Sequence, residues 1–208
     1  MIDPGPTTGT SAFTSPQHAP LELDGPVLRA VRVRRSRARV GRAAPDDADV
    51  ETLLGAAAGV ADHAALRPWR VISLRGAARE RLGAAMVEAA GSTGIEAERL
   101  AAKTLRAPLL LGIVFSPVEH PKATEWEQAA TTSGVAHVLS LLLDEQGWGV
   151  IWRTGSWIDT SPVRALHELA DHERLLGWLY VGEREGPEPA PRVGLDLRGR
   201  LSPLGEHP

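Results

Sequence analysis

The sequence predicts a layered domain of the α/β or α+β class, and three observations support this. Short runs of β-branched and apolar residues alternate with longer segments that carry apolar residues at helical spacing. The length of 208 residues suits one domain of ordinary size with tails. Hydrophobic residues make up 43% and charged residues 24% of the chain, which is a globular balance. We therefore expect a single core between helices and a sheet.

The amino-terminal part divides into a tail and a first helical region. Residues 1–26 are rich in Pro, Gly, Ser and Thr and show little apolar periodicity. We expect a flexible tail there, because such a segment cannot offset its own ordering entropy. Residues 27–40 are at best amphipathic. A helix is expected over about 50–60, with Asp46 or Asp47 as its N-cap.

Two strands and a helical hairpin follow. The apolar runs at 68–74 and 107–117 are too short for helices of that hydrophobicity and predict buried strands. Between them, residues 77–90 and 95–105 carry Ala, Leu, Glu and Arg at helical spacing, and a glycine-containing turn at 91–94 separates the two segments. We expect two helices that form a hairpin.

The longest helix and two further strands come next. Residues 123–146 have apolar residues at helical spacing and predict a central buried helix. The runs at 148–152 and 175–182 predict two more strands. Between these strands, a helix is expected over about 162–170, with Ser161 as its N-cap.

The last residues, 183–208, form a polar and Pro-rich extension beyond the domain expected over 27–182. An alternating apolar patch within the extension comprises Val193, Leu195 and Leu197. Alternation of this kind is typical of a strand. The patch can therefore add to a sheet edge, either of its own chain or of a partner subunit.

The composition excludes several classes of function. With no Cys, the chain cannot form disulfides, use a catalytic thiol or bind zinc or iron–sulfur clusters through cysteine. A net charge of -3 provides no electrostatic footprint for nucleic acid. The seven His residues lack metal-ligand spacing, so we expect no metal site. A secretory signal and a long apolar run are both missing, and we therefore expect a cytoplasmic protein.

The sequence carries no nucleotide-binding fingerprint. Neither a G-x-G-x-x-G at a strand-to-helix junction nor a P-loop occurs, so a phosphate group would need other ligands. The best candidates are Arg34, Arg35 and Ser36, because two guanidinium groups and a hydroxyl can form charge-assisted hydrogen bonds to phosphate. A solvated basic surface is the alternative interpretation of these residues.

Two further polar clusters lie next to predicted strands. The turn at 62–69, with His63 and Arg67, leads directly into the first strand, where polar residues often line a ligand site. Residues 152–155 stand at the end of a predicted buried strand, so their side chains and amides can face a crevice. Taken separately, each cluster also fits an ordinary structural role.

These clusters occur in one order together with other blocks: R-A-P-L at 106–109, E-W-E-Q at 125–128, Q-G-W-G-x-I-W-R-T-G at 146–155 and L-L-G-W-L-Y-V-G at 175–182. In this order and spacing, the sequence resembles the bacterial nitroreductase family of flavoproteins, in its YdjA-like branch. The resemblance covers about residues 28–182.

The resemblance implies an α+β fold with three layers, α/β/α, around a central and mostly antiparallel sheet. It also implies a homodimer with two FMN sites at the interface, each built by both subunits. NADH or NADPH would be the electron donor, and a nitroaromatic, a quinone or a similar small molecule would be the acceptor, in a ping-pong hydride transfer. No protein group is expected to act as the catalytic residue, because the flavin carries the chemistry.

The resemblance assigns eight residues to the FMN site. The Arg-Arg-Ser block would hold the phosphate and ribityl end, and the loop before the first strand would reach the flavin from the partner subunit. The residues are Arg34, Arg35, Ser36, Trp152, Arg153 and Thr154 from one subunit, and His63 and Arg67 from the other.

Three positions depart from the family pattern. Ala61 replaces the usual Pro, Arg67 a common Gln and Thr154 an expected Ser. Thr154 keeps the hydroxyl, whereas Arg67 adds a charge beside the flavin that can alter its chemistry. Two other interpretations stay open. A noncatalytic dimeric flavin- or ligand-binding protein would differ only in turnover, and a purely structural dimer would purify colourless.

Overall fold

The computed structural model describes residues 25–202 and residue 204. Within this part of the chain, four strands form one antiparallel sheet in the order β1-β2-β4-β3. The strands are β1 (Trp69–Arg75), β2 (Leu109–Phe115), β3 (Trp148–Arg153) and β4 (Arg174–Glu183). Of the tail predicted over 1–26, residues 1–24 lie outside the described residues.

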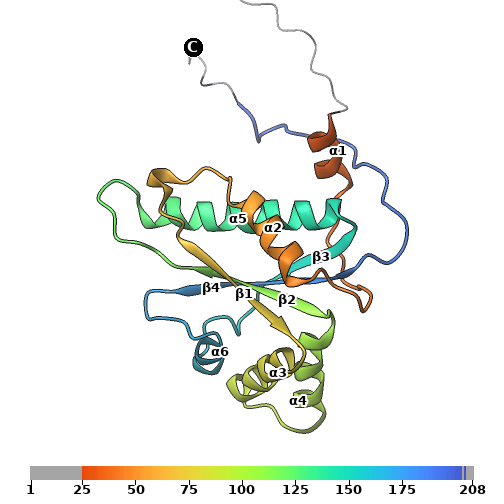
Figure 1. Ribbon diagram of the computed structural model, residues 1–208, viewed down its shortest axis with the longest axis vertical. Helices are drawn as coiled ribbons and strands as arrows, with labels where there is room; N and C mark the ends of the chain where they lie inside the picture. The colour runs from red at the N-terminus through yellow and green to blue at the C-terminus, as the bar shows by residue number, and fades with distance from the viewer. Residues whose placement is uncertain (1–24, 203, 205–208) are drawn as a thin grey trace, which may run out of the picture.

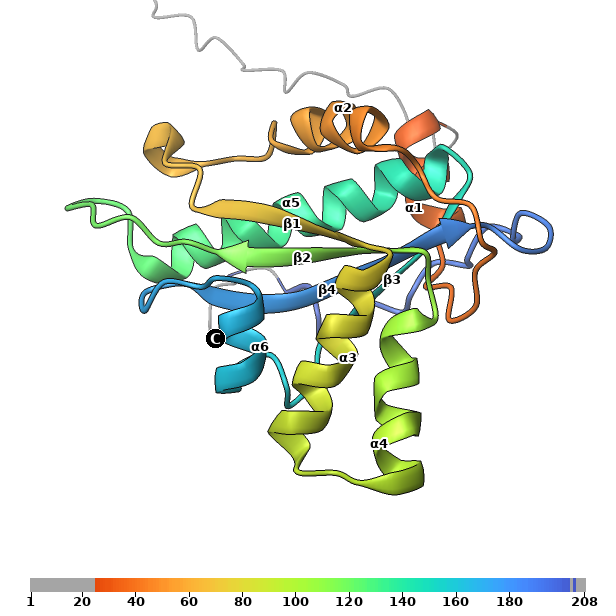
Figure 2. The same cartoon turned by 60° about the horizontal axis from the view of Figure 1, so that its bottom comes forward.

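Helices cover both faces of the sheet (Figures 1 and 2). On one side lie α1 (Pro26–Val33), α2 (Asp47–Ala57) and α5 (Glu125–Glu145); on the other lie α3 (Ala77–Ala90), α4 (Gly94–Ala101) and α6 (Ser161–Leu166). Single 3-10 turns occur at His63–Ala65 and Ala102–Leu105. The three-layer α+β architecture and the antiparallel sheet expected from the sequence are therefore confirmed.

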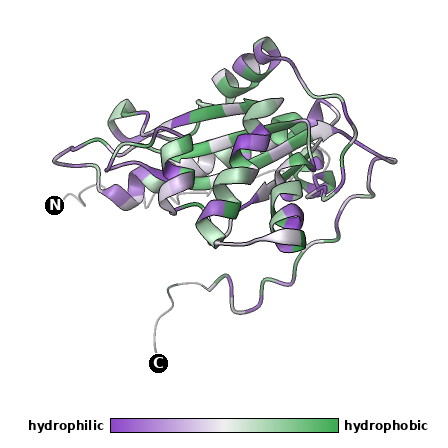
Figure 3. Ribbon diagram, turned by 90° about the horizontal axis from the view of Figure 1, so that it is seen from below, coloured by the Kyte–Doolittle hydropathy of each residue, from purple (hydrophilic) through white to green (hydrophobic). Residues whose placement is uncertain are grey.

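Strand β2 connects the two halves of the core. All seven of its residues are buried, because it lies inside the sheet and has helices above and below. Leu109 and Leu111 pack toward α2 and α5, whereas Leu110 and Val114 pack toward α3 and α4. This alternation follows from the two-residue period of a strand. Figure 3 shows the mainly apolar character of the strands.

A β-bulge breaks the pairing of β2 with β4. The register shifts between Ile113 and Val114, so that one additional residue of β4 is accommodated near Gly177. Gly177 has a φ of 115°, and a Cβ at this position would overlap the carbonyl oxygen of Arg153. A glycine is therefore required where β4 passes the end of β3.

The helix starts test the sequence predictions in detail. Asp46 caps α2, since its Oδ1 accepts a hydrogen bond of 2.8 Å from the amide of Asp49, and this prediction is confirmed. The prediction that Ser161 caps α6 is wrong. Thr160 is the N-cap residue, and Ser161 lies in the first turn beside Pro162. Proline suits the first turn because its missing N–H is not needed there.

The extension after β4 forms no strand within its described part. Val193 and Leu195 are 94% and 79% exposed, so this patch does not join the sheet of its own chain, and packing on a partner subunit stays a prediction. The patch is connected to the domain through Arg192, whose amide donates to the carbonyl of Arg32. None of the described helices is both long and apolar enough to span a membrane.

Candidate functional site

The Arg-Arg-Ser segment connects α1 to the edge of the sheet. Helix α1 ends at Val33, and Ser36 then forms an isolated parallel bridge with Val150 of β3. The amide of Arg37 donates a 2.9 Å hydrogen bond to the carbonyl of Val150. The segment is thereby fixed beside Val150, which precedes Arg153, the last residue of β3, by three residues.

The guanidinium of Arg35 binds backbone carbonyls. It donates to the carbonyls of Arg32 at 2.7 Å and Val33 at 3.0 Å, and these carbonyls belong to the last turn of α1. It also donates to the carbonyl of Ala190 at 2.7 Å, which connects α1 to the carboxy-terminal extension. Arg35 therefore acts as a C-terminal cap in the described chain.

Cations surround one buried carboxylate at the end of α5. Asp144 is only 4% exposed, and burial raises its pKa against the opposing effects of Arg184, Arg34 and Arg37. The Nε and Nη2 atoms of Arg37 are buried without a hydrogen-bond partner among the described residues. This side of the Arg-Arg-Ser segment is thus rich in guanidinium groups, which favours an anionic ligand nearby.

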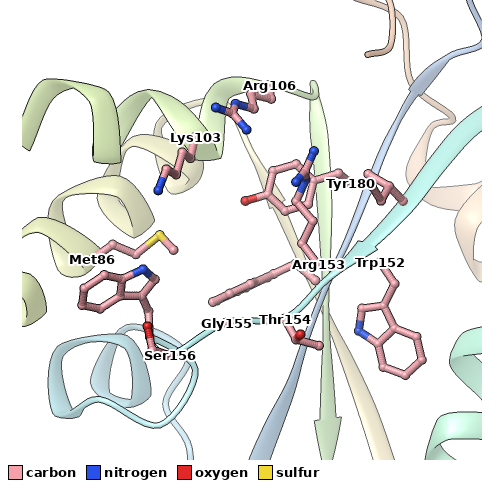
Figure 4. A pocket seen from close by; sticks show the side chains of 12 residues that line it. Met86, Lys103, Arg106, Trp152, Arg153, Thr154, Gly155, Ser156 and Tyr180 are labelled. Atoms are coloured by element: carbon pink, nitrogen blue, oxygen red, sulfur yellow. The ribbon is translucent and has the colours of Figure 1, made fainter. Parts of the chain in front are cut away.

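The end of β3 sends consecutive side chains to opposite faces of the sheet. The indole of Trp152 contacts His137 of α5, with ring centroids 5.1 Å apart, and its Nε1 donates to the carbonyl of Leu176 at 3.1 Å. Arg153 points to the other face, where it lies over the ring of Tyr180. Figure 4 shows Trp152 directed away from the side chains of Lys103 and Met86.

Arg153 lines a pocket of about 530 Å³ on the face of α3 and α4, here called the β3 pocket. This volume is in the range that small-molecule ligands occupy. Three cations line it, and none of the described residues that line it carries a carboxylate. Its lining comprises Met86, Lys103, Arg106, Ile151, Trp152, Arg153, Thr154, Gly155, Ser156, Trp157, Trp178 and Tyr180.

A second hollow of about 570 Å³ adjoins the β3 pocket. Arg106 and Arg153 line both, and residues 38–40 and Glu185 complete the second one. Since only Arg37 separates residues 38–40 from the Arg-Arg-Ser segment, the second hollow lies close to that segment in sequence. The structure therefore places the backbone of the Arg-Arg-Ser segment next to β3, whereas Arg34, Arg35 and Ser36 line neither hollow.

The third cluster lies elsewhere in the chain. His63 is exposed, and its Nδ1 is 3.5 Å from Oε1 of Glu127, near the start of α5. Asp62 fixes the loop, because its Oδ2 accepts from the amide of Arg67 at 2.7 Å. Arg67 is exposed and has a φ of 50°, which is unusual for a residue with a side chain.

The length of helix α5 gives the separation between the His63 loop and the Arg34 region. Glu127, next to His63, and Asp144, next to Arg34, are both on this helix. Seventeen residues of helix correspond to about 25 Å at 1.5 Å per residue. The β3 pocket, moreover, is on the opposite face of the sheet from α5. One chain therefore does not bring His63 and Arg67 to the other predicted residues.

Sequence analysis missed Lys103, Arg106 and Tyr180 as pocket residues. Arg106 was part of the R-A-P-L block, but it had no assigned role, and Lys103 lies in a 3-10 turn at the end of the helical hairpin. Tyr180 is within the L-L-G-W-L-Y-V-G block. Its position two residues after Trp178 places both on one face of β4, and strand alternation was the only signal available for it.

Comparisons with known proteins agree on one family. A model described as "Nitroreductase family" matches residues 31–183. YdjA of Escherichia coli K12, provisionally named an NAD(P)H nitroreductase, is 29% identical over 152 residues, which cover 72% of this chain and 83% of YdjA. YfhC of Bacillus subtilis, also provisionally so named, is 30% identical over 174 residues, which cover 80% of this chain and 88% of YfhC.

Solved structures show the same fold. A nitroreductase-like protein from Bacillus cereus superposes with a TM-score of 0.75 at 18% identity and covers 89% of this chain and 99% of its own. The FMN- and NADPH-dependent nitroreductase NfnB from a Sphigopyxis strain has a TM-score of 0.66 at 18% identity and covers 86% and 99%, respectively.

Proposed function

The chain belongs to the nitroreductase family, and from this premise we propose that it is an FMN-dependent NAD(P)H oxidoreductase. Family and relatives support an oxidoreductase of the flavin type in general. The observation that carries the specific proposal is the β3 pocket, where three cations and several aromatic rings meet without a carboxylate. FMN combines an aromatic ring system with an anionic phosphate, and this chemistry matches the lining.

One unsatisfied polar atom at the pocket also fits FMN. The Nε atom of Arg153 is buried and has no hydrogen-bond partner among the described residues. A buried guanidinium donor without an acceptor is unfavourable, and a bound anionic or carbonyl-bearing ligand would satisfy it. Lys103 and Arg106 add positive charge at the same pocket.

We assign the ring of FMN to the β3 pocket and its phosphate and ribityl end to the Arg-Arg-Ser segment, which pairs with β3 but lines neither hollow. Arg34, Arg35 and Ser36 would hold the phosphate and ribityl end. For Arg35 this requires an exchange of partners, because its guanidinium binds the carbonyls of α1 and Ala190 in the described chain. Trp152, Arg153 and Thr154 would flank the ring, with Trp152 contributing backbone because its indole faces α5.

His63 and Arg67 would come from a second copy of the chain. They lie about 25 Å along α5 from the Arg34 region, so a site that uses both clusters needs two subunits. We therefore propose a homodimer with two FMN sites at its interface. The exposed patch at Val193 and Leu195 would pack on the partner subunit. Light scattering that gives a monomer with FMN bound would contradict this arrangement.

When bound, FMN would accept a hydride from NADH or NADPH and then reduce a nitroaromatic, a quinone or a similar acceptor. The protein's part is to bind and orient the ring and to exclude water. The cations of the β3 pocket would stabilise negative charge on the ring, because electrostatic interactions are stronger in a partly dry site. Arg153 is best placed for this, since its guanidinium is already fixed over Tyr180.

Titration of the purified protein with FMN, followed by steady-state oxidation of NADH and NADPH with a nitroaromatic and a quinone, tests the proposal. We expect quenched flavin fluorescence with a Kd at or below the micromolar range, and turnover with at least one donor and acceptor pair. Binding without turnover would support a noncatalytic flavin-binding protein. A colourless protein that fails to bind FMN at tens of micromolar would contradict the proposal altogether.

A further inference from the structure

Two aromatic residues of β4 reach the β3 pocket, and each carries one polar atom. Trp178 is 2% exposed and Tyr180 is 4% exposed, and both line the pocket. Their positions two residues apart place both rings on the same face of the strand. Buried indole N–H and phenol O–H groups normally have hydrogen-bond partners. The two residues differ in this respect.

The indole of Trp178 is satisfied inside the chain. Its Nε1 donates to Nε2 of His167 at 3.0 Å. Nδ1 of His167 lies 2.8 Å from the carbonyl of Val163, so this nitrogen carries the proton and Nε2 is free to accept. Burial lowers the pKa of His167, which keeps the imidazole neutral.

The hydroxyl of Tyr180 forms no hydrogen bond in the part of the chain that the structure describes, and it is not among the fully buried polar atoms without a partner, so it is accessible from the pocket. Arg153 lies 5.4 Å from the centre of the phenol ring and so contacts its face rather than its hydroxyl. Figure 4 shows the hydroxyl directed into the pocket, on the side where Lys103 and Met86 lie. The oxygen therefore faces the space that a ligand would fill.

We propose that the Tyr180 hydroxyl donates a hydrogen bond to the heteroaromatic ring of the ligand in the β3 pocket, an inference that rests on the FMN binding proposed above. We assign the ring rather than the phosphate as the acceptor, because Met86, Trp157 and Trp178 line this pocket and can pack against an aromatic ring. Tyr180 would thus be a ligand-contacting residue that fixes the orientation of the ring.

The state of the phenol supports a donor role. Burial raises the pKa of Tyr180, and the opposing effects of Arg153 and Arg106 are smaller. The hydroxyl consequently keeps its proton at neutral pH. A protonated phenol that cannot donate within the protein is available to a carbonyl oxygen or ring nitrogen of the ligand.

Tyr180 is the only tyrosine of the chain, which makes it directly observable. Protein labelled with 3-fluorotyrosine gives a single ¹⁹F resonance, and the resonance can be followed during titration with FMN, riboflavin or inorganic phosphate. We expect FMN and riboflavin to shift the resonance and phosphate to leave it in place. A shift with phosphate alone would overturn the assignment to the ring.

Removal of the hydroxyl gives a second readout. For Tyr180→Phe, the Kd for FMN should rise about fivefold, and the absorption maximum of the bound flavin should shift, because one hydrogen bond to the ring is lost. The control is Ser140→Ala, which deletes a buried hydroxyl that donates to the carbonyl of Ala136 within α5. This control should leave both the Kd and the spectrum unchanged.

The outcomes separate this inference from the proposed function. If the wild-type protein binds no FMN, the function and the inference fail together. If it binds FMN while the ¹⁹F resonance stays in place and Tyr180→Phe binds equally well, only the inference fails. Thermal unfolding of both variants shows whether a change in Kd reflects the lost contact or a damaged fold.

Discussion

The two ends of the molecule that carry the predicted FMN ligands differ in how complete they are within one chain. At the end of β3, the strand, the helical hairpin and β4 converge on a pocket with three cations. At the loop before β1, His63 and Arg67 are exposed, and the nearest charged partner of His63 is Glu127 on the same side of the sheet. The first region can be tested in a single subunit, whereas in the proposed homodimer the second would contribute only to the FMN site of the partner subunit.

The strongest test of the self-contained region is Arg153→Ala. We expect the Kd for FMN to rise by roughly 10- to 100-fold, because a charge-assisted hydrogen bond contributes about 1.5–3 kcal/mol. Fluorescence titration measures the effect. Arg39 lines the second hollow only, so Arg39→Ala is a matched control and should weaken FMN binding less than Arg153→Ala does. Equal losses in the two variants would show that Arg153 acts only through the general charge of the region.

The loop before β1 leads into a strand that an ion pair between Arg70 and Glu173 stabilises, and Glu173→Gln should weaken this ion pair. Glu173 is 6% exposed and accepts two 2.7 Å hydrogen bonds from Arg70, and this partner lowers the pKa of Glu173 to about 2. The variant should lose about 1.5–3 kcal/mol of unfolding free energy at neutral pH. Urea unfolding measures the loss, and the Kd of the folded protein for FMN should stay unchanged.

The same carboxylate predicts a pH dependence. A folded-state pKa below the usual value of 4.5 means that the stabilisation is complete above about pH 4.5 and is lost as the pH falls toward 2. The stability difference between the wild type and Glu173→Gln should therefore shrink over this window. A difference that stays constant down to pH 2 would contradict the role assigned to the Arg70–Glu173 pair.

Arg67→Gln tests whether the exposed loop affects the flavin. If the guanidinium reaches the ring from the partner subunit, it stabilises the reduced flavin, and its removal should lower the midpoint potential by about 30 mV, equal to roughly 1.4 kcal/mol for two electrons. Spectroelectrochemistry resolves such a change. An unchanged or higher potential would show that Arg67 does not stabilise the reduced flavin in this way.

Mixed dimers test whether each FMN site takes residues from both subunits, and half of the sites should be restored. Arg153→Ala and His63→Ala subunits, each weakened alone, would form heterodimers in which one of the two sites combines an intact Arg153 with an intact His63. We expect that half of the sites in isolated heterodimers regain the wild-type Kd. If each site were built from a single chain, both sites in the heterodimer would be defective, and the two-subunit site would be refuted.

Much of the fold could be predicted from local sequence. The short apolar runs identified all four strands, and Asp46 identified the start of α2, because these signals depend on residues close in sequence. The strand order β1-β2-β4-β3 depends on contacts between distant segments, and periodicity does not contain it. The assignment of Ser161 as a cap failed because Thr160 and Ser161 are both suitable cap residues by type.

The site was less accessible to sequence reasoning. Trp152 and Arg153 were grouped as neighbours, but a strand separates neighbours onto opposite faces. Lys103 and Tyr180 come from a 3-10 turn and from the middle of a strand, and only the packing of the hairpin against β4 brings them to one pocket. For Arg35, one of the carbonyls that it binds, that of Ala190, depends on where the extension after β4 returns to α1.

The opposite orientation of Trp152 and Arg153 also limits how this protein can evolve. A single inserted or deleted residue in the turn before β3 would shift the strand by one position, turning the charged side chain into the α5 core and the indole toward the pocket. A substitution in β3 alters one side chain at a time. A change of length in the turn before β3 would instead move Trp152 and Arg153 to each other's face of the sheet at once. Length variation among descendants should therefore accumulate at the tip of the α3–α4 hairpin, where Gly91 and Gly94 lie in open space, and avoid the residues between α5 and β3.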